Sequence, residues 1–108
     1  MPRLTENEYQ AQLIKKLEFR FPGCVILKND SSYKQGILDL TILHKRRWAG
    51  LEVKRSGRER LQPNQQYFID ALNKLSYAAV IFPENEEEVL NALQQAFEPS
   101  GRACVSES

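Results

Sequence analysis

Two strand-like segments separated by a short basic turn constrain the fold of this chain most strongly. Residues 37–43 consist mostly of Ile and Leu, residues 48–54 carry the apolar Trp48, Ala49, Leu51 and Val53, and only the basic turn 44–47 lies between them. A connection this short joins antiparallel strands, because parallel strands need a crossover of a dozen or more residues. A hairpin centred on this turn sets Asp39 opposite Glu52.

The charged residues of this hairpin are the first candidates for a functional site. Asp39 interrupts an otherwise apolar strand, and burying a carboxylate there is costly unless something pairs with it. Directly opposite residues have Cβ atoms roughly 4.5–5.5 Å apart, and Glu52 and Lys54 share one face of their strand. Two adjacent carboxylates repel each other unless a cation lies between them.

Two interpretations of this group follow. The simpler one is a structural salt bridge, in which Lys54 pairs with Asp39 or Glu52. The other is a divalent metal site, because one or two carboxylates plus a backbone carbonyl suit Mg²⁺ and leave several waters on the ion. In that case Lys54 would hold or polarise the attacking water and meet a scissile phosphate.

The rest of the chain alternates between helical and strand patterns. Thr5 and Glu8 have the spacing of a capping box, and Asn85 with Glu88 opens the last helix. Pro63 suits the first turn of a helix. The patterns predict helices over 5–21, 63–75 and from residue 85, and further strands over 24–29 and 77–82. The expected order is α-β-β-β-α-β-α, an α/β domain over residues 1–98 with a mixed sheet flanked by helices, followed by a flexible tail, 99–108.

At four places this pattern resembles the metal-dependent PD-(D/E)xK nucleases, which have a restriction-endonuclease-like core. The segment Gly36-Ile37-Leu38-Asp39-Leu40 precedes Glu52-Val53-Lys54 by the spacing that such cores use, although Leu38 stands where the family usually has Pro. Pro63-Asn64-Gln65 matches the Pro-x-Gln that opens the next helix. Glu6, Tyr9 and Gln10 match the spacing in the first helix. More narrowly, residues 5–83 resemble the small stand-alone VRR-NUC type of phages and bacteria, related to Holliday-junction resolvases.

The resemblance implies a DNA endonuclease that hydrolyses phosphodiester bonds, most often in branched DNA, with Mg²⁺ as cofactor and Mn²⁺ as its substitute. It also implies a homodimer, with no organic cofactor. The implied site consists of metal ligands and catalytic groups: Asp39, Glu52 and the Val53 carbonyl on the metal, Lys54 as the catalytic lysine, Gln65 orienting Lys54 or the phosphate, and Glu6 as a ligand or auxiliary acid. Simpler roles remain open for Glu6 as a helix-start acid, for Gln65 as a polar helix residue, for Gln10 on the surface and for His44 in the turn.

The charge is unevenly distributed along the chain. The net charge of +1, from 15 Lys and Arg against 14 Asp and Glu, argues against a bulk polyanion binder. Residues 45–60, however, hold seven cations and two acids, whereas residues 83–98 hold five acids and no cation. The expected DNA contacts are basic side chains, including several in the flexible stretch after the third strand: Lys28, Lys34, Arg55, Arg58 and Arg60.

The same charges leave two other function classes open. One is a non-catalytic nucleic-acid-binding module on the same fold. The other is a protein-interaction adaptor that uses the acidic helix 86–97. The single histidine and the absence of a Cys-x-x-Cys motif argue against zinc. No apolar segment is long enough to cross a membrane, and two cysteines (Cys24, expected in the core, and Cys104, in the tail) are too few for a disulfide framework, so we expect a cytosolic protein. The resemblance to the VRR-NUC type implies the cytosol of a bacterium or of a phage-infected host.

Overall fold

The computed structural model describes residues 4–99, so Cys104 and all but the first residue of the expected tail lie outside it. The elements run in the order α1 (Glu6–Arg20), β1 (Val25–Lys28), β2 (Leu40–His44), β3 (Arg47–Val53), α2 (Pro63–Leu75), β4 (Tyr77–Ile81), a short 3₁₀ turn (Pro83–Asn85) and α3 (Glu86–Phe97). This order confirms the predicted α/β pattern.

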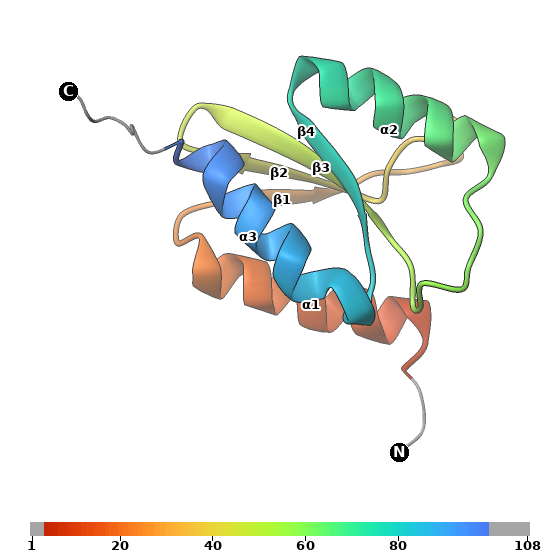
Figure 1. The fold of residues 1–108 in the computed structure, drawn as a ribbon, viewed down its shortest axis with the longest axis horizontal. Coiled ribbons are helices and arrows are strands. Elements are labelled where there is room, and N and C mark those ends of the chain that lie inside the picture. The colour runs from red at the N-terminus through yellow and green to blue at the C-terminus, as the bar shows by residue number, and fades with distance from the viewer. Residues whose placement is uncertain (1–3, 100–108) are drawn as a thin grey trace.

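The four strands form one mixed sheet in the order β1-β2-β3-β4. The first two neighbouring pairs are antiparallel and β3 pairs with β4 in parallel, which confirms the predicted mixed sheet and its central hairpin. Helices α1 and α3 cover one face of the sheet and α2 covers the other (Figure 1). The larger part of the core lies between the sheet and the α1–α3 pair, and a smaller cluster lies beneath α2.

The β2–β3 hairpin has the predicted register, from His44 opposite Arg47 to Leu40 opposite Leu51. Its two turn residues, Lys45 and Arg46, have φ angles of 52° and 71°. Positive φ at both central positions defines the hairpin turn that matches strand twist, and Asn or Gly normally occupies it. The basic turn therefore places two long cationic side chains in a backbone conformation that is unfavourable for them.

This strain gives a testable expectation for stability. Arg46→Gly should raise the free energy of unfolding by about 1 kcal/mol, because glycine adopts positive φ without steric cost. Arg47→Gly is the matched control, since Arg47 lies in β3 and glycine there should destabilise the strand. Urea titration of both variants checks the prediction, and equal destabilisation by the two substitutions would contradict it.

The start of the second strand differs from the prediction. β2 begins at Leu40 rather than at residue 37, so Asp39 immediately precedes the strand. The side chain of Asn29 contacts the chain on either side of Asp39. Its amide nitrogen donates to the Leu38 carbonyl (2.8 Å) and to Thr41 Oγ1 (2.9 Å). The Asn29 backbone N–H also donates to the Asp39 carbonyl at 2.9 Å. Together these bonds fix the backbone around Asp39.

The helices confirm most of the predicted caps and faces. Thr5 and Glu8 form the expected capping box. Gln10 is buried, so its expected surface position was wrong. In α2, Ile69 is buried with Phe68 and Leu72 partly buried beside it, whereas Leu75, the last residue of the helix, is 73% exposed.

Two residues at element ends also differ from expectation. The Asn85 side chain does not cap α3; its amide accepts from the Phe82 N–H and donates to the Val80 carbonyl, so it fixes the 3₁₀ turn instead. His44 is not a solvent-exposed turn residue. It is the last residue of β2, and its ring packs edge-on against Phe21 and Phe97.

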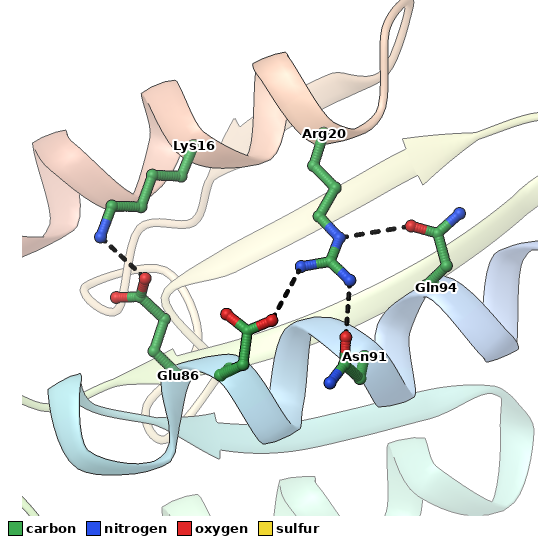
Figure 2. Close-up of polar contacts among 6 residues, drawn as sticks. Lys16, Arg20, Glu86, Asn91 and Gln94 are labelled. Carbon is green, nitrogen blue, oxygen red and sulfur yellow. Dashed lines mark hydrogen bonds and ion pairs between the residues drawn. The ribbon is translucent and has the colours of Figure 1, made fainter.

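The acids of α3 face cations on α1 (Figure 2). Lys16 Nζ lies 2.8 Å from Glu86 Oε2. Arg20 Nη2 donates to Asn91 Oδ1 (2.7 Å) and Arg20 Nε donates to Gln94 Oε1 (3.3 Å). Arg20 Nη1 lies 3.8 Å from Glu87 Oε2. Part of the acidic character of α3 is therefore compensated within the chain, which weakens the adaptor interpretation.

Candidate active site

The charged residues of the hairpin meet at the end opposite its turn. Asp39 precedes β2, Glu52 is the penultimate residue of β3, and Lys54 follows that strand directly. The first turn of α2 supplies Gln65, which contacts Glu52. The structure thus brings the predicted residues together from the open end of the hairpin and from a helix.

Glu52 is the most constrained member of the group. Its side chain is 2% exposed. Its Oε2 accepts a hydrogen bond from Gln65 Nε2 at 2.7 Å and lies 3.6 Å from Lys54 Nζ. Its Oε1 is buried with no hydrogen-bond partner among the described residues. Burial, followed by the negative charge of Asp39, raises the pKa of Glu52 to about 7.

Asp39 lies beside the backbone of β3. Its Oδ2 accepts a hydrogen bond from the Val53 N–H at 2.8 Å. Burial raises the pKa of Asp39, while the Val53 N–H and the charge of Lys54 act in the opposite direction. The regular pairing ends at Leu40 and Leu51, so Asp39 reaches Glu52 from the loop before β2 and not from the strand.

Glu6 joins this group from the start of α1. The loop that follows β3 returns to the first turn of α1 (Figure 1), which brings the two segments together. Burial raises the pKa of Glu6, and the charge of Asp39 raises it further, whereas Lys54 lowers it. Three acids therefore share an environment in which Lys54, with a side chain that is 12% exposed, is the nearest compensating cation.

Gln65 contacts a different partner from the one expected. Its Nε2 donates to Glu52 rather than to Lys54, and its Oε1 accepts from the Gln62 backbone N–H at 2.9 Å. The second contact fixes the amide orientation, because the oxygen must point to a donor. Gln65 is thus a positioning residue for Glu52.

The group has features that fit a divalent metal ion. The acids of the group carry more negative charge than Lys54 can neutralise, and Glu52 Oε1 has no hydrogen-bond partner among the described residues. A bound cation would compensate both. Within residues 4–99, no three His, Cys, Asp or Glu side chains form a metal-binding cluster by themselves. Asp39 and Glu52 would therefore need the predicted Val53 carbonyl and water as further ligands, which is the coordination that Mg²⁺ commonly accepts.

The predicted DNA-contacting residues are distributed around this site. Arg55 forms an ion pair with Glu59 at 2.8 Å, so part of its charge is used inside the loop. Lys34 lies over the Phe68 ring, 5.7 Å from its centroid. The remaining three, Lys28, Arg58 and Arg60, are exposed.

The loop after β3 is anchored and does not match the flexible stretch that was expected. Ser56 is buried, and its Oγ accepts from the Arg58 N–H at 3.1 Å. Gly57 lies against the Phe82 ring, where an added Cβ would be 2.8 Å from Cε2. These contacts fix the loop, and the charge of its Arg55 lowers the pKa of Glu6.

The positioning roles of two residues were missed from the sequence. Asn29 bonds to the Leu38 carbonyl and to the Thr41 hydroxyl, on either side of Asp39, and an asparagine at the end of a strand carries no distinctive signal. Gly36 has φ of +88°, and a Cβ there would lie 2.4 Å from Asn64 Cβ. The resemblance included Gly36 in the motif before Asp39, but it did not indicate this packing against α2.

The role of Gln65 can be tested by removing its amide. Gln65→Ala should lower kcat for the proposed cleavage about 10- to 100-fold with little change in KM, the usual cost of losing a group that orients a ligand. Without the Gln65 hydrogen bond the pKa of Glu52 should rise, which moves the pH–rate profile to higher pH. Gln66→Ala, one residue along α2 and bonded to Asp70, is the control. An unchanged kcat and profile for Gln65→Ala would contradict the role.

Fold and site together define an α/β domain with a carboxylate–lysine group at the open end of a hairpin. A solved structure described as a VRR_NUC domain protein shares this fold, with a TM-score of 0.66 and 22% sequence identity over 91% of this chain and 92% of that chain. The match confirms the fold class expected from the resemblance. No protein-family model matches the sequence, and no curated protein matches it. None of the described helices is long and apolar enough to cross a membrane.

Proposed function

We propose that this chain is a Mg²⁺-dependent DNA endonuclease. The observation that carries the proposal is the buried, unpartnered Oε1 of Glu52, in a group of three acids for which Lys54 is the main compensating charge. A carboxylate that is kept buried and incompletely paired is costly to the fold, and functional sites are where such cost is retained. The VRR-NUC fold supports a nuclease among the functions of such a site.

The residues take distinct roles in this proposal. Asp39 and Glu52 hold the ion, with the Val53 carbonyl as a third protein ligand. A bound divalent cation supplies positive charge that stabilises the phosphate oxygens and makes water more acidic. Lys54 binds the attacking water or the scissile phosphate, and Gln65 keeps Glu52 in place. Glu6 adds negative charge beside Asp39.

The proposed substrate is branched DNA cut by a homodimer. A domain of 108 residues offers a small surface, and two coordinated cuts in a four-way junction require two active sites. A two-fold symmetric dimer supplies them. Sedimentation equilibrium with and without a four-way junction tests this part, and a strictly monomeric protein in both conditions would refute it.

A panel of labelled DNA structures tests the proposal. Purified protein should cleave four-way junctions or flaps with Mg²⁺ or Mn²⁺, and EDTA should stop the reaction. Inactivity on junction, flap, duplex and single-stranded DNA with both metals would reject the nuclease proposal.

A non-catalytic DNA-binding module is the second candidate. The observation that favours it is the internal pairing of Glu52 Oε2 with both Lys54 and Gln65, which is also what a structural ion pair would show. Such a module would bind DNA with an affinity that falls steeply with salt and would cleave nothing.

A further inference from the structure

A hollow of about 380 Å³ lies next to the proposed active site. One wall is the loop before β2, with Ser31, Gln35 and Gly36, and the other is the segment 62–65 at the start of α2. Gln65 connects the hollow with the proposed active site, because it lines the hollow and donates to Glu52. The volume of the hollow is within the range of small-molecule sites, about 300–1,000 Å³.

The chemistry of the walls favours a neutral ligand that both donates and accepts hydrogen bonds. In the part of the chain that the structure describes, no charged side chain lines the hollow. At the start of α2 the backbone offers few free donors, because the Gln65 and Gln66 N–H groups both bond to the Gln62 carbonyl and Pro63 has no N–H. The available polar side chains are exposed and neutral: the amides of Gln35, Gln62 and Asn64 and the hydroxyl of Ser31. Amides of this kind pair with the edges of nucleobases, whereas phosphate selects cations.

An aromatic side chain stands on the same loop. Tyr33 is 89% exposed, so it contributes little to the core. The loop around it is ordered by Asp30, whose Oδ1 accepts from the Ser32 N–H (2.9 Å) and from Ser32 Oγ (2.7 Å). At its other end Gly36 packs against Asn64. An exposed aromatic on a fixed loop is a platform on which an unpaired base can stack.

We infer that this hollow binds one unpaired nucleobase of the DNA strand, next to the phosphate that is cut. Gln35 and Asn64 contact the edge of the base, and Tyr33 stacks on it or on its neighbour. The inference rests on the proposed nuclease function and adds to it a reason for structure specificity, because a fully paired duplex cannot offer a base to the hollow without unpairing it.

Binding without cleavage tests the inference separately from the nuclease proposal. The probes are a labelled flap, a labelled blunt duplex of equal length, and a flap with an abasic site at the first unpaired position, all in EDTA. Wild-type protein should bind the flap about tenfold more tightly than the duplex and the abasic flap, as expected for one stacked base. Gln35→Ala, Asn64→Ala and Tyr33→Ala should each lower affinity for the flap several-fold and leave affinity for the duplex unchanged. The test variant Asn64→Ala keeps the Cβ that packs on Gly36, so we expect it to retain the fold.

Two matched control variants change residues outside the hollow. Phe19→Ala removes an aromatic that is also 89% exposed but lies on α1, and Gln66→Ala removes an amide of α2 outside the hollow. Neither control should change discrimination. Equal affinity of wild type for all three probes, or equal losses on flap and duplex in the variants, would overturn the inference. Absence of cleavage in Mg²⁺ would instead reject the nuclease proposal.

Discussion

Asp39→Asn and Lys54→Ala should each reduce the rate of Mg²⁺-dependent DNA cleavage on the order of 10³-fold, the usual cost of removing one charged group from a polar active site. Asn at position 39 keeps an oxygen that can accept the Val53 N–H, so the backbone contact should survive. Because the expected loss is chemical, both variants should fold and should retain DNA binding. Single-turnover cleavage of the best substrate in the panel measures the effect.

Matched substitutions at other positions show whether these losses are specific. Asp70→Asn makes the same change at an exposed acid of α2, and Lys74→Ala removes an exposed lysine from the same helix. Both controls should cleave within about twofold of wild type, as expected for surface positions away from the site. Asp39 or Lys54 variants that retained wild-type rates would reduce the carboxylate–lysine group to a structural ion pair.

Glu52→Gln should abolish cleavage and at the same time stabilise the metal-free fold. The wild-type carboxylate is buried and has a pKa of about 7, so ionising it above that pH costs stability. Gln keeps an oxygen to accept from Gln65 and carries no charge. At pH 8 in EDTA we expect a gain of up to about 3 kcal/mol in the free energy of unfolding, the size of the pKa shift multiplied by 1.36 kcal/mol per unit. Urea titration of both proteins measures it.

The direction of the pH dependence follows from the same group. The folded protein holds the Glu52 proton to higher pH than the unfolded chain does, so its stability falls as pH rises from the ordinary carboxyl range to about 7. The difference between wild type and Glu52→Gln should therefore be small near pH 4 and reach its maximum above pH 7. Mg²⁺ should raise the stability of wild type at pH 8 and leave the variant unchanged. A variant less stable than wild type across this range would contradict the account.

The hairpin was predictable because short-range rules fix it. A two-residue turn between two apolar segments determines the register, and the register brings the acid-bearing end of one strand to that of the other. The start of β2 was not predictable in the same way. The backbone of residues 37–39 is held by contacts with Asn29, whose side chain bonds to the Leu38 carbonyl and to the Thr41 hydroxyl. Such a contact is tertiary and leaves no periodic signal.

The sequence indicated which residues would lie together, but not the contacts among them. Charge and the hairpin register identified Asp39, Glu52 and Lys54, whereas Glu6 and Gln65 came from the resemblance to PD-(D/E)xK nucleases. The partner of Gln65 depends on the position of α2 relative to the sheet, and side-chain packing sets that position. The sequence likewise did not indicate that the basic loop is anchored, because the anchoring contacts are tertiary: Ser56 is buried and Gly57 lies against the Phe82 ring.

The central claim is that Asp39 and Glu52 together hold one divalent ion. Anomalous diffraction from a crystal soaked in Mn²⁺ tests it most directly. We expect one manganese peak in contact with both carboxylates, and no such peak in a crystal of Asp39→Asn prepared in the same way. Carboxylates more than about 8 Å apart, beyond the diagonal spacing across neighbouring strands, or manganese bound only elsewhere, would contradict the claim.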